Sequence, residues 1–481
     1  MKHIHGWLRA TTIVSALAVS ATASATTGYF ALGYGAKAMG MVGAVVSNPQ
    51  DSAVIAVNPA GLTEIGERFD LGMRFFSPIR EAELNTSVVS GTFDVDDKSR
   101  RNLFLIPNIG FNMKIGDNLW FGFNNYGNGG LNSTYDRNLY DEAFAVLGAA
   151  QFGIPGLCDP AALPPGVTTC AQLVPLGAGT GTPDTGKLGV DLVQAIFAPS
   201  LATKFRDNHS VGVALLIGVQ RFSARGLGNF QCFTQTGAPQ AGCNPPPGQP
   251  PTGPAIPSDG LTENSSDWAF GAGARIGWLG EVHPRLTLGA SYSSKVYMTE
   301  FDDYDELFAE QGDLDIPANF TLGATFKATP KLKLSFDFQQ IQYEGVNSIS
   351  NPGPALGPSV PPGSGPLGAD NGLGFGWEDI NIYRLAAVYD YDSSWTFRGG
   401  FAMNDQPIPD SEVLFNILAP ATIEKHATLG FTFRPDKTSE WNFAYMHAFK
   451  ETVSTSQSAF GVPASIEMYQ NSVDLSYSKK F

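Results

Sequence analysis

The sequence predicts an all-β protein: a fourteen-stranded antiparallel transmembrane β-barrel with an N-terminal plug inside its lumen. Three observations predict this fold: strand-length segments that alternate apolar and polar residues, connections that alternate short and long, and few charges. Charged residues make up 16% of the 481 residues, whereas a soluble domain usually has about 25%. Aromatic residues make up 11% of the chain and apolar residues are spread along all of it, which argues against a disordered chain.

Residues 1–25 have the pattern of a secretory signal peptide. Lys2 and Arg9 supply positive charge, a small apolar stretch follows, and Ala23, Ser24 and Ala25 fit a cleavage site. The rest of the chain has no run of about 18 apolar residues, so no transmembrane helix is expected. An exported chain without such a helix is either soluble or a closed barrel, because only helices and closed barrels satisfy every backbone group in lipid.

The spacing of the strand candidates favours the barrel. Short turns and long loops alternate between them, giving seven long and six short connections, as in outer-membrane barrels. A soluble sandwich has no reason to place every long loop at one end. The candidates lie at 67–77, 102–114, 118–127, 189–205, 209–222, 267–279, 284–297, 316–327, 331–344, 377–391, 394–405, 422–434, 439–450 and 465–481.

The last strand candidate has one apolar and one polar face. Val473, Leu475, Tyr477 and Phe481 share the apolar face at a period of two. A terminal phenylalanine on such a strand resembles the assembly signal of bacterial outer-membrane proteins. We therefore expect the outer membrane of a Gram-negative bacterium, with its lipid, lipopolysaccharide and barrel-assembly machinery as partners. The net charge of −15 argues against a nucleic-acid partner.

Residues 26–65 precede the first strand and are apolar, glycine-rich and nearly uncharged. Such a segment avoids water, so we expect it to fill the barrel mouth as a plug, with the barrel and its long external loops at 66–481. Several barrel residues turn apolar side chains inward, among them Phe104, Ile106 and Leu216. These residues either line a site for an apolar ligand or pack against the plug, and both alternatives remain open.

One external loop shows helical spacing at Phe301, Tyr304, Leu307 and Phe308, which predicts a short amphipathic helix. Such a helix either catches an apolar ligand or packs on its own loop. The alternation of side chains along the strands predicts that three cationic residues point inward: Lys295, Arg384 and Arg398. They either neutralise a ligand carboxylate or form ion pairs with Asp337 or Glu424.

The four cysteines lie in two long loops, and the local pairing joins Cys158 to Cys170 and Cys232 to Cys243. No metal site is expected, because the cysteines have neither CxxC spacing nor a nearby histidine. The histidines of the mature chain, His209, His283, His426 and His447, lie in separate segments. We therefore expect no enzyme and no cofactor.

Three motifs resemble the FadL/TodX (OmpP1) family of outer-membrane transporters for long-chain fatty acids and hydrocarbons. The plug resembles the N-terminal hatch of that family, at Gly33, Gly35, Met39, Gly40, Asn58, Pro59 and Ala60. Residues 198–213 are similar to its central hairpin, and residues 307–319 resemble its fourth external loop and the following strand. The proline-rich stretches at 244–257 and 351–368 and the cysteine pairs have no counterpart in this resemblance.

The resemblance implies passive transport: capture at external loops, binding above the hatch, and lateral release where the third strand kinks. Here that strand ends in glycines, which predicts a lateral gate at Gly127, Gly129 and Gly130. The first candidate substrate is a long-chain fatty acid, which the inward cations favour. Aromatic or alkane hydrocarbons are the alternative. The rival from another class is a structural barrel or adhesin with a filled lumen.

Overall fold

The computed structural model describes residues 27–85, 94–141, 186–237, 259–354, 364–456 and 463–481. The predicted signal peptide lies outside the described residues, as do Cys158, Cys170 and Cys243. Among the residues that the structure describes, no helix is long and apolar enough to cross a membrane.

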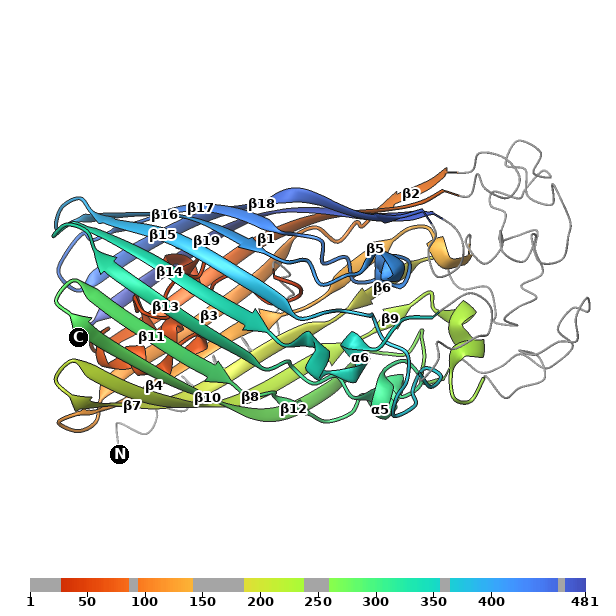
Figure 1. Cartoon of the computed structure of the whole chain (residues 1–481), viewed down its shortest axis with the longest axis horizontal. Coiled ribbons are helices and arrows are strands. Elements are labelled where there is room, and N and C mark those ends of the chain that lie inside the picture. Colours follow the sequence, from red (N-terminus) through yellow and green to blue (C-terminus); the bar gives the residue numbers. More distant parts are fainter. Residues whose placement is uncertain (1–26, 86–93, 142–185, 238–258, 355–363, 457–462) are drawn as a thin grey trace, which may run out of the picture.

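The described chain forms a closed antiparallel β-barrel, which confirms the predicted fold (Figure 1). Its main sheet has 16 strands; β2 (Asp94–Lys98) and β12 (Tyr297–Met298) only extend neighbouring pairs, so 16 − 2 = 14 strands make the wall. The last strand pairs with the first, and Arg68 lies opposite Lys480. The wall strands are β1 (Arg68–Asn85), β3 (Phe104–Lys114), β4 (Leu119–Gly129), β7 (Val193–Arg206), β8 (His209–Phe222), β10 (Asp267–His283), β11 (Leu286–Ser293), β13 (Asn319–Lys327), β14 (Leu332–Ile341), β15 (Ile380–Asp390), β16 (Trp395–Asn404), β17 (Lys425–Phe433), β18 (Ser439–Thr455) and β19 (Ala464–Lys480).

The two ends of the barrel differ as the spacing predicts. Figure 1 shows tight turns at one end and the long connections at the other, which we call the turn end and the loop end. A small separate sheet at the loop end joins β5 (Asn132–Tyr135), β6 (Leu188–Asp191) and β9 (Ala224–Arg225). Short helical turns complete the loops: η5 (Gly228–Phe233), η6 (Asp302–Tyr304), α5 (Ala309–Gly312), η7 (Tyr343–Gly345), α6 (Asn347–Ser350), η8 (Asp410–Glu412) and η9 (Phe415–Ile417).

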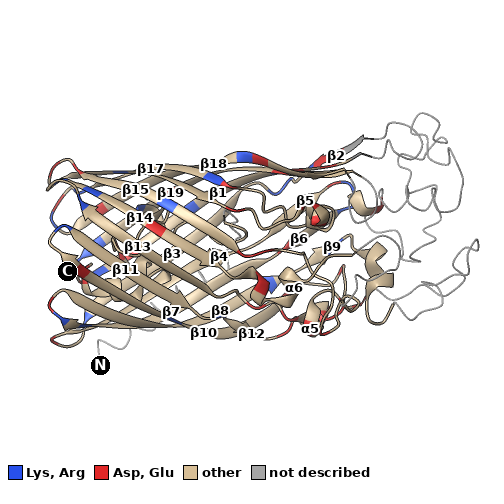
Figure 2. Ribbon diagram, viewed as in Figure 1, with Lys and Arg blue, Asp and Glu red and all other residues tan. Residues whose placement is uncertain are grey.

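Period-two alternation separates a lipid-facing surface from an inner surface along the wall. Leu215 and Phe336 are exposed on the outside, whereas their neighbours Leu216 and Asp337 are buried inside. Large apolar side chains cover the outer surface of most strands. Figure 2 shows few charges along the middle of the barrel and more of them toward its ends, as expected for a wall with a lipid-facing band.

The segment 27–65 folds inside the turn-end half of the barrel as α2 (Gly35–Met39), η1 (Ser52–Ala56) and η2 (Pro59–Thr63) (Figure 1). Most of its side chains are buried. Small residues permit this compact folding. Gly43 has a φ of 80°, and a Cβ atom there would lie 2.0 Å from the carbonyl oxygen of Leu32. Only glycine fits that position.

Candidate functional site

The predicted hatch residues all lie within the plug, which we call the hatch from here on. Asn58 connects it to the wall: its Oδ1 accepts a hydrogen bond from Ala60 N at 3.1 Å, and its Nδ2 donates to Val46 O and to Trp278 O of β10. Pro59 follows as the first residue of η2, where its missing N–H costs nothing. Gly35 and Met39 are the first and last residues of α2, Gly33 and Gly40 flank it, and Met39 is fully buried.

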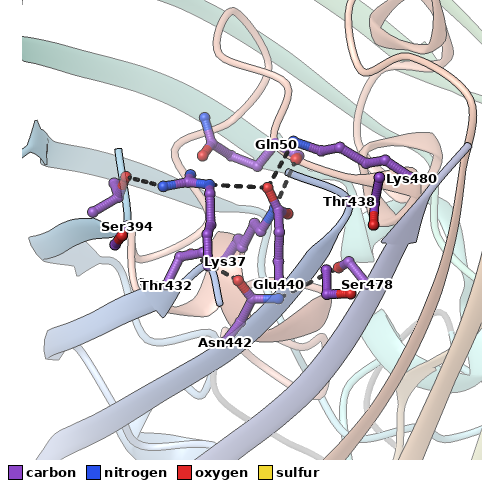
Figure 3. Close-up of polar contacts among 12 residues, drawn as sticks. Lys37, Gln50, Ser394, Thr432, Thr438, Glu440, Asn442, Ser478 and Lys480 are labelled. Carbon is purple, nitrogen blue, oxygen red and sulfur yellow. Dashed lines mark hydrogen bonds and ion pairs between the residues drawn. The ribbon is translucent and has the colours of Figure 1, made fainter. Parts of the chain in front are cut away.

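A charged cluster fixes the hatch at the turn end. The carboxylate of Glu440, 2% exposed, lies 2.5 Å from Lys37 Nζ of the hatch and 3.2 Å from Arg68 Nη2. Arg434 and Lys480 also reach Glu440, at 3.1 and 2.7 Å. Figure 3 shows Lys37 and Lys480 directed at Glu440 from the hatch and from the wall. One wall carboxylate is thus shared by four cations, which we call the Glu440 cluster.

Arg398 lies beside this cluster and also holds the hatch. Its Nη1 donates to Thr432 Oγ1 at 2.7 Å, and its Nη2 donates to Gln50 Oε1 of the hatch at 3.1 Å. Thr432 in turn donates to Asn442 Oδ1 (Figure 3). Alternation therefore predicts the inward direction of Arg398, but its guanidinium contacts the hatch rather than an open cavity.

Arg384 and Lys295, the other two cations predicted to point inward, also contact protein side chains. Arg384 on β15 lies opposite Asp337 on β14 and donates to Gln339 Oε1 at 2.6 Å, while Asp337 Oδ2 accepts from Val46 N of the hatch at 2.9 Å. Lys295 Nζ lies 2.9 Å from Asp315 Oδ2, so its ion pair forms with Asp315 and not with Asp337 or Glu424.

An apolar cavity lies beyond the hatch toward the loop end, with an empty volume of about 380 Å³. We call it the upper cavity; its lining is Tyr29, Leu131, Val190, Leu192, Phe222, Phe308, Leu314, Ile349, Phe375 and Trp377. None of these side chains is charged. The indole Nε1 of Trp377 donates to Asn416 Oδ1 at 2.6 Å, which leaves its ring for apolar contacts.

The loop at 301–318 closes one side of the upper cavity. The predicted short amphipathic helix is interrupted: the segment forms η6 and α5, because Phe308 between them is extended, with φ −88° and ψ 143°. Phe308 lines the cavity and packs on Phe222, with ring centroids 4.8 Å apart. Tyr304 and Leu307 are buried behind it, and Tyr304 Oη donates to Asn264 O. The sequence leaves two roles open for this segment, contact with an apolar ligand or packing on its own loop. Tyr304 packs within the loops, whereas Phe308 also lines the upper cavity.

The wall is interrupted between β3 and β4. Their ladder runs only from Lys114–Trp120 to Ile109–Asn125, although β3 continues to Phe104 beside β1. The hatch replaces β3 beyond that point: Ala31 N donates to Asn128 O and Gly130 N donates to Tyr29 O, each at 3.1 Å. Pro107 faces the interruption and has no N–H to donate. This β3–β4 gap is a break in the barrel wall that the first described hatch residues partly cover.

The predicted gate glycines border this gap. A Cβ atom on Gly127 would lie 2.7 Å from Ile106 Cγ2, and one on Gly129 would lie 2.0 Å from Tyr29 O. A cavity with an empty volume of about 310 Å³ opens there, between Ile106 and Pro107 on one side and Gly127 on the other. Phe104 and Gly130 line a neighbouring cavity, while Leu216 packs in the core of the barrel.

Sequence reasoning missed two features of this region, the end of the β3–β4 ladder and the upper cavity's tryptophan. Pro107 in the middle of a strand candidate was the available signal for the first, because proline disrupts a central ladder.

Cys232 is disulfide-bonded, and its partner lies outside the described residues. No group of three or more His, Cys, Asp or Glu side chains in the described part of the chain could hold a metal ion.

Comparison with known proteins identifies the family. Residues 183–478 match the family model described as outer membrane protein transport protein (OMPP1/FadL/TodX). The chain belongs to this family. The resemblance seen in the sequence is confirmed, and the chain is an outer-membrane transport protein for hydrophobic compounds rather than an enzyme.

Individual relatives are distant. The "Long-chain fatty acid transport protein" of Escherichia coli O6:H1 is 32% identical over 75 residues, which cover 16% of this chain and only 17% of that protein. The structure of the P. putida toluene transporter TodX has a TM-score of 0.62 at 17% identity, covering 94% of this chain and 99% of TodX. A Pseudomonas aeruginosa FadL homologue gives a TM-score of 0.61 at 15% identity, covering 94% and 100%. These solved structures share the fold.

Proposed function

We propose that the protein takes up hydrophobic molecules passively, holds them in the upper cavity, and releases them sideways through the β3–β4 gap. The observation that carries this proposal is the uncharged upper cavity, which shares Tyr29 with the hatch segment that covers the gap. An apolar ligand gains free energy by leaving water for such a cavity, roughly 25 cal/mol for each Å² of apolar surface buried.

The substrate we propose first is a long-chain fatty acid, in line with the name of the Escherichia coli relative. The upper cavity suits the hydrocarbon chain of such an acid. An aromatic hydrocarbon is the second candidate, because Lys295, Arg384 and Arg398 contact other protein groups and none of them lines the upper cavity. The TodX neighbour is named as a toluene transporter.

The gate role of Gly127, Gly129 and Gly130 is part of this proposal. So are the predicted contacts with lipopolysaccharide and with the barrel-assembly machinery. The exposed Phe481, at 82%, is available for the latter contact. The predicted cysteine pairs stay predictions as well.

Uptake measurements test the transport function. Cells that lack this gene would receive the wild-type gene or the Val190→Trp variant, whose added ring would fill the upper cavity. We expect wild-type protein to restore uptake of a labelled long-chain fatty acid or of toluene, and Val190→Trp to lose most of it. Val213→Trp is the matched control, because Val213 faces outward on β8.

A structural barrel predicts a different result. Wild-type protein in the outer membrane would then leave the uptake of both compounds at the level of cells without the gene. Equal uptake by wild-type and Val190→Trp proteins would instead show that ligands bypass the upper cavity.

A further inference from the structure

A third cavity lies between the upper cavity and the β3–β4 gap. It has an empty volume of about 280 Å³ and shares Leu131 with the upper cavity. Its walls are largely apolar and include Phe76, Phe104 and Met468. Phe104 belongs to the part of β3 that leaves the β4 ladder, so this side cavity adjoins the gap.

One charged side chain, Arg80 of β1, lines the side cavity. Arg80 is only 4% exposed, its Nε has no hydrogen-bond partner, and its guanidinium lies over the Phe104 ring, 5.8 Å from the centroid. Within the described residues its guanidinium makes one hydrogen bond, from Nη2 to the carbonyl oxygen of Arg101, and no ion pair. A buried charge without a counter-charge is costly to a fold.

The neighbouring acids are already engaged by other cations. Glu81, next to Arg80 in the chain, pairs with Lys98 at 3.0 Å. Asp191 pairs with Arg101 and with Arg221. Arg384 and Arg398 differ from Arg80, because each of them holds side chains of the wall or hatch. Arg275 is also buried without an ion pair among the described residues, but it donates to Ile55 O and to Tyr126 Oη. Arg80 therefore stands out as a buried guanidinium in the side cavity that has neither a carboxylate nor a side-chain acceptor among the described residues.

We propose that Arg80 binds the carboxylate of an amphiphilic substrate whose hydrocarbon chain occupies the upper cavity. This assignment rests on the proposed transport function and selects acids over neutral hydrocarbons. Leu131 borders both cavities, so a headgroup at Arg80 and a chain among the rings of the upper cavity are neighbours. A guanidinium offers a carboxylate two parallel N–H donors, and the apolar walls keep water from weakening that contact.

Binding to the purified barrel tests the assignment with two probes of equal chain length, hexadecanoic acid and 1-hexadecanol, at neutral pH. Arg80→Gln should weaken binding of the acid about 10- to 100-fold, the range for a lost hydrogen bond to a charged group, and leave the alcohol unchanged. Arg80→Lys keeps the charge and should retain much of the affinity for the acid. Arg100→Gln is the matched control, because Arg100 is exposed to water and pairs with Asp136.

Each other outcome decides against the assignment. Equal weakening of acid and alcohol would give Arg80 a purely structural role through its bond to Arg101, and unchanged affinity for both would exclude it from the site. If wild-type protein bound neither probe nor toluene, the transport function itself would fail. Strong binding of toluene and 1-hexadecanol without the acid would preserve transport and refute the carboxylate site.

Discussion

Replacing Glu440 with glutamine removes the charge that fixes the hatch to the wall. The substitution keeps the shape of the side chain but leaves four cations around a neutral amide. The positive charges of three of those cations remain stabilised without Glu440. Arg68 pairs with Asp70 at 2.8 Å, and Arg434 and Lys480 are partly exposed to water. Lys37 is 3% exposed and would keep only its 3.3 Å hydrogen bond to Gln50 O.

The expected cost follows from that single uncompensated charge. Removing one partner of a buried ion pair typically costs about 3–5 kcal/mol, and we take the lower end because the Gln50 carbonyl still accepts from Lys37. About 3 kcal/mol corresponds to a roughly 100-fold larger population of the detached hatch. The barrel wall should keep its stability, because its ladders do not depend on Lys37.

Hydrogen exchange measures this population directly. The amide of Gly40, which donates to Ala36 O in α2, should exchange roughly 100-fold faster in Glu440→Gln than in wild-type protein. Glu281→Gln is the matched control, because its ion pair with Lys327 also lies near the turn end but is solvent-exposed. Unchanged exchange at Gly40 in a folded Glu440→Gln barrel would refute the view that the Glu440 cluster holds the hatch.

Two further predictions concern the gap and the loops. Gly127→Leu should slow uptake at least about tenfold, because its side chain would meet Ile106 inside the gap, whereas Gly116→Leu in a turn should not; equal uptake would exclude a gate there. Burial, and then the charge of Asp315, raises the pKa of Asp313 to about 7 from 3.8. Its contribution to docking of the 301–318 loop is therefore fully present below about pH 4 and lost as the pH rises through 7. The protection factors of the loop amides, which correct the exchange rates for their intrinsic pH dependence, should be larger at pH 5 than at pH 8, and Asp313→Asn should remove the difference.

The wall was predictable from the sequence because each strand carries its own signal. Alternation at a period of two separates a lipid face from a lumen face without reference to any neighbour, so all fourteen candidates correspond to wall strands. The ends of strands were less predictable. The candidate at 67–77 continues as β1 to Asn85, and this extension carries Arg80 into the side cavity.

For the candidate site, the sequence predicts which side chains face inward but not what they contact there. Alternation indicates that Arg384 and Arg398 face inward, yet it does not say whether the hatch or a cavity lies opposite them. That depends on how residues 27–65 fold inside the barrel, which is decided by contacts such as Arg398 with Gln50, 348 residues apart. The β3–β4 gap is equally non-local, because it is a property of two strands and the hatch together.

The hatch is held unequally at its two ends, and this constrains how the proposed exit opens. Lys37 and Asn58 hold the turn-end part through a buried ion pair and side-chain hydrogen bonds. The part that covers the gap carries no charged side chain: two backbone hydrogen bonds of Tyr29 and Ala31, each worth about 1 kcal/mol net, join it to β4, and Tyr343 Oη donates to Thr27 O and accepts from Tyr29 N. Moving residues 27–31 away from β4 therefore breaks neutral hydrogen bonds and the ring contacts of Tyr29 and Phe30, whereas expelling the hatch would also break the buried ion pair of Lys37. Lateral release needs only this smaller movement, and it leaves the turn end of the barrel closed.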